Sequence, residues 1–217
     1  MKKWGMVIDL KRCIGCWACF MACRSKNFLP RGVHWNRVIT GESGKYPTVR
    51  KEMYPVLCNH CADAACVDVC PTGATSKRED GIVQIDYDKC IGCRTCLLAC
   101  PYQQRTYFDG KDVEYYPGQG LTPFEELGRQ LKPLKKGTVV KCNFCVDRIE
   151  SGIDKRLVPG EDEAATPACV NACPTEARVF GDLNDPNSNV CNQIKRRSGY
   201  QLHPEFETNP SVYYLPA

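Results

Sequence analysis

Four groups of closely spaced cysteines are the part of this sequence best suited to chemistry. The third group, Asp88–Pro101, reads D-K-C-I-G-C-R-T-C-L-L-A-C-P, with the spacing C-x2-C-x2-C-x3-C-P. Three thiolates on such a tight loop can hold three corners of a cubane iron–sulfur cluster, while the fourth Cys ligates a different cluster. One such run therefore predicts a second, and this chain has four.

The runs fall into two alternating types. Runs one and three, Cys13–Cys23 and Cys90–Cys100, both open on C-I-G-C. Runs two and four, Cys58–Cys70 and Cys142–Cys173, both open on C-N-x-C and close on C-P-T. This alternation indicates a duplicated unit of two runs.

Pairing the runs assigns the ligands. A strand-like stretch separates runs two and three, so we expect them to form one module, with runs one and four closing a second module around it. In each pair of runs, the fourth Cys of one run joins the first three Cys of the other. This gives four sites of four thiolates, each suited to a [4Fe–4S] cluster. The predicted ligands are Cys13, Cys16, Cys19 and Cys173 at site 1; Cys142, Cys145, Cys169 and Cys23 at site 2; Cys58, Cys61, Cys66 and Cys100 at site 3; and Cys90, Cys93, Cys96 and Cys70 at site 4.

The expected fold is α+β, with two bacterial-ferredoxin-like modules that bind two clusters each. Residues 1–52 and 138–183 would form the outer module and residues 53–109 the inner one. Residues 110–137 hold no Cys and form a predicted insertion, and residues 184–217 a C-terminal tail that wraps the body.

Apolar and alternating patterns around the runs predict several short elements. Asn27–Lys51 is instead rich in Gly and Pro and is expected to be mostly loop. The strands are expected at Trp4–Leu10, Gly81–Tyr87, Thr106–Phe108, Thr138–Lys141 and Arg178–Gly181, a helix at Pro123–Leu131 and a helical turn at Pro167–Ala172.

Two other uses of the cysteines compete with iron–sulfur clusters. Four thiolates also suit zinc, although zinc sites usually combine two C-x2-C pairs. A disulfide scaffold would not need ligand spacing four times over. Cys191 remains outside all four runs and is expected to be a buried free thiol that is not a ligand.

Charge and hydropathy limit the possible functions. The net charge of +4, from 29 basic and 25 acidic residues, is too balanced to indicate nucleic-acid binding. Met1–Lys11 carries no secretory or twin-arginine signal, and no apolar run is long enough for a membrane span. Basic residues that flank ligands could favour the reduced clusters or could simply be surface charges; they are Arg12, Lys89, Arg94 and Lys141.

The order of the runs, with x4 in run two and a 23-residue gap in run four, resembles the four-cluster electron-transfer subunit of the dimethyl sulfoxide reductase superfamily. This family includes iron–sulfur subunits of polysulfide, thiosulfate, tetrathionate and arsenate reductases and of phenylacetyl-CoA:acceptor oxidoreductase. The resemblance covers residues 4–183. It implies a non-catalytic subunit of a complex, of the kind used in anaerobic respiration.

The resemblance also implies partners. One is a catalytic subunit that holds molybdenum or tungsten on two pyranopterin guanine dinucleotides, next to site 1. The other, at site 4, is a membrane quinol subunit or a soluble carrier. Export with the catalytic subunit would place the complex on the extracytoplasmic face of the membrane, and a cytoplasmic complex is the alternative. A stand-alone polyferredoxin is the competing function.

Overall fold

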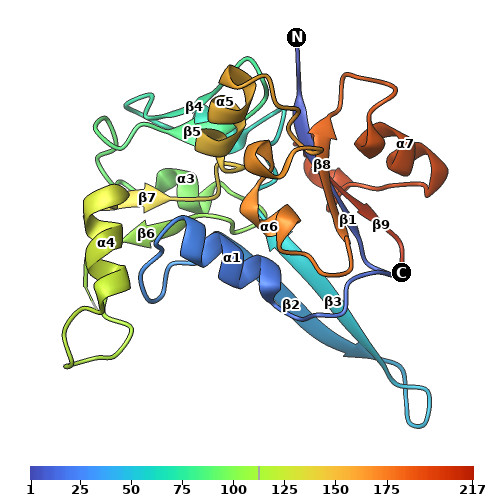
Figure 1. Ribbon diagram of the computed structural model, residues 1–217, viewed down its shortest axis with the longest axis horizontal. Coiled ribbons are helices and arrows are strands. Elements are labelled where there is room, and N and C mark those ends of the chain that lie inside the picture. Colours follow the sequence, from blue (N-terminus) through green and yellow to red (C-terminus); the bar gives the residue numbers. More distant parts are fainter. Residues whose placement is uncertain (112) are drawn as a thin grey trace.

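The computed structural model describes residues 1–111 and 113–217 (Figure 1). Short helices and strands alternate along these residues, in agreement with the predicted α+β class. Position 112 of the predicted insertion lies outside the described residues.

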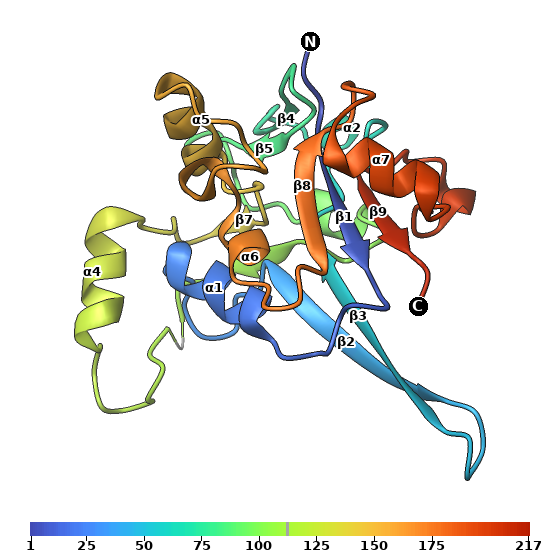
Figure 2. The same cartoon turned by 45° about the vertical axis from the view of Figure 1, so that its right-hand side comes forward.

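A three-stranded sheet places the N-terminal and C-terminal strands of the chain side by side (Figure 2). β1 (Trp4–Asp9) lies in the centre, with β8 (Arg178–Asp182) antiparallel on one side and β9 (Val212–Leu215) parallel on the other. All six residues of β1 are buried, as expected of a central strand whose two faces are both covered. The predicted strands near Trp4 and Arg178 are therefore confirmed.

The C-terminal tail contributes to the core. It contains α7 (Asn189–Arg196) and β9, although no regular element is predicted there from the sequence. Val190 of α7 and Leu215 of β9 pack against Val7 of β1 in a small buried cluster. The tail therefore covers one face of the sheet and also extends it.

A long hairpin corrects the expectation of a loop at Asn27–Lys51. β2 (Asn36–Ser43) and β3 (Arg50–Leu57) pair antiparallel along their whole length and project from the body (Figure 1). The outer half of this hairpin is exposed, so its residues are polar and show no apolar alternation. The predicted module boundary between residues 52 and 53 falls within β3.

Two further hairpin-like pairs lie close to the cysteine runs. β4 (Thr75–Lys77) pairs with β5 (Val83–Ile85), and β6 (Thr106–Phe108) pairs with β7 (Thr138–Val140). Strands β5, β6 and β7 confirm the predictions at Gly81–Tyr87, Thr106–Phe108 and Thr138–Lys141. The short helices are α1 (Ala18–Lys26), α2 (Ala65–Asp68), α3 (Thr95–Leu98), α5 (Val146–Asp154) and α6 (Ala168–Asn171), with single 3-10 turns at Glu163–Ala165 and Pro204–Phe206.

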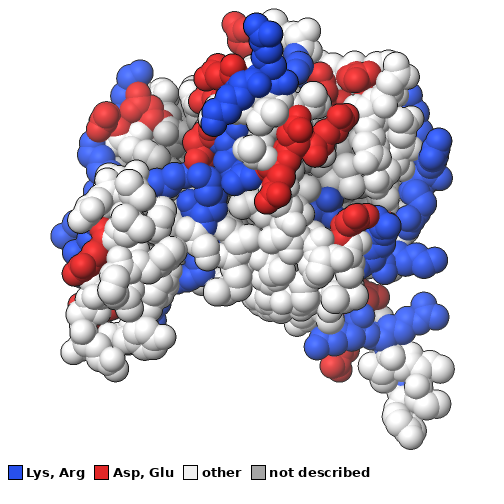
Figure 3. Space-filling model, viewed as in Figure 1, with Lys and Arg blue, Asp and Glu red and all other residues white. Residues whose placement is uncertain are grey.

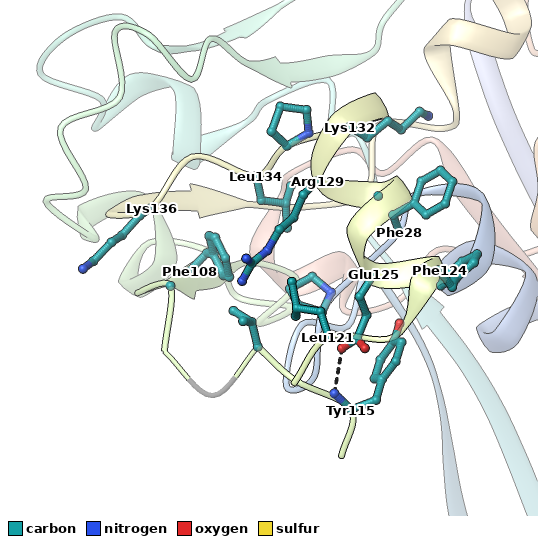
Figure 4. Close-up of a pocket in the computed structure, with 15 residues that line it drawn as sticks. Phe28, Phe108, Tyr115, Leu121, Phe124, Glu125, Arg129, Lys132, Leu134 and Lys136 are labelled. Atoms are coloured by element: carbon teal, nitrogen blue, oxygen red, sulfur yellow. Dashed lines mark hydrogen bonds between the residues drawn. The ribbon is translucent and has the colours of Figure 1, made fainter. Parts of the chain in front are cut away.

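The Cys-free insertion contains the predicted helix, α4 (Pro123–Leu131). Thr122 and Glu125 form a capping box, in which the Glu125 amide donates to the Thr122 hydroxyl at 3.3 Å and the Thr122 amide donates to the Glu125 carboxylate at 2.8 Å. Figure 4 shows α4 beside a largely apolar pocket, with Phe28, Phe108 and Phe124 in its wall.

Acidic and basic side chains are interspersed on the face shown in Figure 3. An area with few charges lies over the part of the molecule where Figure 1 places α1 and the base of the hairpin. Within the described residues, no helix combines the length and the apolar character needed to cross a lipid bilayer.

Candidate iron–sulfur sites

A short helix separates the third Cys from the fourth in every run. Cys19 and Cys23 both lie on α1. In the other runs the third Cys lies on a one-turn helix and the fourth follows two residues after its end, as the pairs Cys66 and Cys70, Cys96 and Cys100, and Cys169 and Cys173 show. The helix therefore carries the fourth thiol away from the loop that holds the first three.

The residue just before the second Cys takes a left-handed backbone conformation in all four runs. The φ angles are +67° at Gly15, +44° at His60, +69° at Gly92 and +56° at Phe144. This turn lets the chain fold back so that the first two thiols face the same space. At Gly92 glycine is required for a second reason, because a Cβ there would collide with the carbonyl of Gly137.

The thiols predicted for sites 1 and 2 lie near one another. Burial, and then the thiols of Cys19 and Cys173, raise the pKa of Cys13. Burial and the neighbouring thiols of Cys142, Cys169 and Cys145 raise the pKa of Cys23 well above its usual value. Such charge effects require proximity, so the structure places each of these groups in one neighbourhood.

Sites 3 and 4 show the same grouping. Burial, together with the thiols of Cys58, Cys66 and Cys100, raises the pKa of Cys61 to about 12. At site 4, burial raises the pKa of Cys96, Arg105 opposes that rise, and the thiols of Cys70 and Cys90 add to it.

Two of the groups also surround cavities. One cavity is lined by the predicted site 1 thiols, with the side chains of Ile14 and Trp17 at its edge. The other is lined by the predicted site 4 thiols, next to Ile91. Their cysteines are Cys13, Cys16, Cys19 and Cys173 in the first, and Cys70, Cys90, Cys93 and Cys96 in the second.

Backbone N–H groups point at several of the sulfurs. The amides of Thr75, Phe144 and Ala177 donate to the sulfurs of Cys70, Cys142 and Cys173 at 3.3, 3.4 and 3.2 Å. Burial alone would raise the pKa of Cys70, but the Thr75 amide and the Thr72 hydroxyl lower it to about 7. Such donors stabilise thiolates and tune clusters.

Thiols of different sites also act on one another, which identifies neighbouring sites. The Cys19 thiol of site 1 acts on Cys169 of site 2, whose pKa burial raises to about 11. Burial, and then the Cys58 thiol of site 3, raise the pKa of Cys142 of site 2. Sites 1 and 2 are therefore neighbours, and so are sites 2 and 3.

Of the four cations expected to flank ligands, only one is buried beside the thiols. Arg12, Lys89 and Arg94 are exposed, whereas Lys141 is buried, and its Nζ donates to the carbonyls of Cys142 and Val83. Two buried arginines, Arg105 and Arg178, were missed. Each follows the last Cys of its run by five residues, and this recurrence could have identified them.

A buried nitrogen without a hydrogen-bond partner also fits an iron–sulfur cluster. Among the described residues, Nη2 of Arg105 is buried without a hydrogen-bond acceptor. Cluster sulfur would accept from this donor, so the residues present fit the group. Cys191 lies elsewhere and is only partly buried, which corrects the expectation of a buried thiol, and the thiol donates to the Leu183 carbonyl at 3.3 Å. Within residues 1–111 and 113–217, no three His, Cys, Asp or Glu side chains are grouped as ligands of a single metal ion.

The comparisons with known proteins first define the class. Two families, each described as a 4Fe-4S dicluster domain, match this chain, one over residues 12–74 and the other over residues 49–115. Two dicluster domains give four [4Fe–4S] clusters, which agrees with the 17 cysteines. The four clusters predicted from the runs are confirmed, in preference to zinc or disulfides.

Full-length relatives then define the family. The chain is 43% identical to a putative dimethyl sulfoxide reductase iron–sulfur subunit of Halobacterium salinarum, over 99% of this chain and 79% of that protein. It is 39% identical to the arsenate respiratory reductase iron–sulfur subunit of Shewanella sp. (strain ANA-3), over 97% and 95%. It is 37% identical to the iron–sulfur cluster-binding subunit of menaquinone reductase of Nitratidesulfovibrio vulgaris, over 98% and 88%.

The chain therefore belongs to the iron–sulfur subunits of the dimethyl sulfoxide reductase superfamily. It is an electron-transfer subunit of an oxidoreductase complex, and it is not the catalytic subunit. The predicted family and function are confirmed.

Proposed function

We propose that the four clusters occupy sites 1 to 4 with the ligands assigned above, two in each ferredoxin-like module. The mutual charge effects among the thiols of each site support this assignment. Thiols of site 1 act on site 2 and those of site 3 act on site 2, and Arg105 acts on thiols of both sites 3 and 4. These neighbours support a relay in which electrons pass from site 1 through sites 2 and 3 to site 4, or in the reverse direction.

The exposure of the thiols at the two ends carries this proposal. Cys16 of site 1 and Cys93 of site 4 are exposed, whereas all four thiols of site 2 are buried. A relay needs its end clusters near the surface, where a partner can exchange electrons, and its middle clusters away from water.

Apolar side chains surround both exposed ends. Met21 follows the site 1 ligand Cys19 by two residues and is 55% exposed, and Leu98 follows the site 4 ligand Cys96 by two residues and is 83% exposed. Ile14 and Ile91, one residue after the first Cys of runs one and three, are exposed as well. Apolar rims of this kind mark surfaces that protein partners cover.

The partner at site 1 is proposed to be a catalytic subunit that holds molybdenum or tungsten on two pyranopterin guanine dinucleotides. The partner at site 4 is proposed to be a membrane quinol subunit or a soluble carrier. The relatives include iron–sulfur subunits of a putative dimethyl sulfoxide reductase and of a menaquinone reductase, which supports this arrangement. We further propose that the complex is exported with its catalytic subunit and lies on the extracytoplasmic face of the membrane. Protease added to intact spheroplasts should then digest this chain.

Native co-purification tests the proposed partners. Under anaerobic conditions, a tagged chain should retain a larger subunit whose metal analysis shows molybdenum or tungsten. A brown 24.4 kDa species that elutes alone from native extract would contradict the proposal and favour a stand-alone polyferredoxin.

A further inference from the structure

Two buried arginines occupy corresponding places in the two predicted modules, each after the second cysteine run of its module. Arg105 follows Cys100 by five residues, and Arg178 follows Cys173 by five residues. Their exposed fractions are only 6% and 3%. A buried guanidinium stays charged and must find anionic or hydrogen-bonding partners.

Arg178 lies between the thiols of two different sites. Its strongest charge interactions are with Cys169 of site 2 and Cys19 of site 1. Its Nη2 donates to the side-chain oxygen of Asn36 at 2.9 Å, and its Nη1 lies 3.7 Å from the sulfur of Met6. These neutral contacts fix the guanidinium but leave its charge uncompensated.

Arg105 is placed in the same way between the other two sites. It interacts most strongly with Cys66 and Cys58 of site 3 and then with Cys96 of site 4. Its Nη1 donates to the Thr75 hydroxyl at 3.2 Å, while its Nη2 is unpartnered among the described residues. No carboxylate of the described part of the chain forms an ion pair with Arg105 or Arg178.

We propose that Arg178 and Arg105 are positioning residues for electron transfer, each a fixed cation shared by two clusters. Arg178 would raise the reduction potentials of sites 1 and 2 together, and Arg105 those of sites 3 and 4. In each transfer one electron leaves one cluster, which is oxidised, and enters its neighbour, which is reduced. The added negative charge is stabilised by a nearby cation, most strongly in a low-dielectric interior. A cation between two clusters therefore raises the reduction potentials of both clusters. The difference between the two potentials changes little.

The test is a redox titration followed by EPR on the anaerobically purified complex. Arg178→Gln should lower the potentials of two clusters and leave the other two in place, and Arg105→Gln should shift the complementary pair. We expect at least a tenfold change in each affected reduction equilibrium, equivalent to about 59 mV for a one-electron couple. Arg178→Lys and Arg105→Lys keep the charge and should restore most of the potential.

Arg12→Gln is the matched control. Arg12 also adjoins a ligand, Cys13, but it is exposed, so solvent screens its charge and we expect less than a twofold change in the reduction equilibrium. The proposal is overturned if the buried variants shift no potential, shift all four equally, or shift no more than Arg12→Gln.

A second variant covers the case in which Arg178→Gln fails to assemble. Asn36→Asp is isosteric and places a carboxylate beside the Arg178 guanidinium, so it should lower the same pair of potentials. Unchanged potentials in that variant would contradict the proposal. The inference rests on the proposed ligand assignment, which iron analysis tests separately: a correct iron count with unshifted potentials removes only the role of the arginines.

Discussion

At the scale of residues, the function depends on which thiols hold iron. Cys169→Ser changes a buried thiol of site 2, and we expect the loss of one cluster, about four irons per chain by chemical analysis. Cys191→Ser is the control, because the hydrogen bonds of that thiol go only to the backbone carbonyls of Asp182 and Leu183. It should leave the iron content unchanged, and equal iron loss in both variants would refute the assignment.

Thiol ionisation makes cluster loading depend on pH. Burial raises the pKa of Cys61 to about 12 and of Cys169 to about 11, so these groups stay protonated at neutral pH in the cluster-free chain. Each must lose its proton to bind iron, and loading therefore releases protons and is favoured as the pH rises. Anaerobic reconstitution should yield more iron per chain at pH 8.5 than at pH 6.5, with acidification of a weakly buffered sample. Equal loading at both values would contradict this account.

The sequence was informative about ligands and less informative about charges. Thiol spacing separates Cys191 from the sixteen cysteines of the runs, since ligand loops need short, regular separations. Burial of a cation cannot be read from spacing. Lys141 and Arg12 both precede a ligand, yet only Lys141 is buried. The important arginines lie after the runs, where the chain turns back into the core.

At the scale of elements, β9 is the least expected part of the core. Val212, Tyr214 and Leu215 are fully buried, and the Tyr214 hydroxyl donates to the Pro55 carbonyl at 2.8 Å. Removal of residues 211–217 should cost about 5 kcal/mol or more, because three large side chains lose their burial and β1 loses a neighbour. We expect poor soluble yield and early thermal loss of cluster absorbance. A truncated chain as stable as the parent would show that β9 does not belong to the core.

Ion pairs connect the end of helix α4 to helices α5 and α1. The carboxylate of Asp147 on α5 lies 2.9 Å from the Nζ of Lys26 and 2.9 Å from that of Lys132, which follows α4. Asp147→Asn should speed amide exchange in α4 by about two- to fivefold, the range expected for a partly exposed ion pair. Glu150→Gln changes a second acid of α5 that pairs with Arg78 instead and should leave α4 unaffected. Hydrogen exchange with mass spectrometry compares the two.

The elements that sequence patterns revealed include fully buried strands and also elements whose apolar side chains stay partly exposed, such as α4. β1 is apolar along most of its length, and Thr122 and Glu125 mark the start of α4. The outer part of the β2–β3 hairpin pairs only with itself, so nothing selects apolar residues there. β9 is four residues long and lies in a polar tail, and its burial depends on a strand more than 200 positions away.

At the scale of the whole molecule, the two exposed ends should contact different partners. Met21→Asp places a charge in the apolar rim of site 1, and Leu98→Asp does so at site 4. We expect the first to weaken capture of the catalytic subunit and the second to weaken capture of the other partner, each by about tenfold or more. Iron content should stay normal in both. Native pull-down with quantitative mass spectrometry measures the effect, and loss of the same partner in both variants would contradict the two-ended arrangement.

The most direct test of the account is the iron and acid-labile sulfide content of the full chain, isolated in its complex without oxygen. Four clusters of four irons predict about 16 irons and about 16 sulfides per chain, with little zinc. Values near half of this, or stoichiometric zinc without sulfide, would contradict a four-cluster relay.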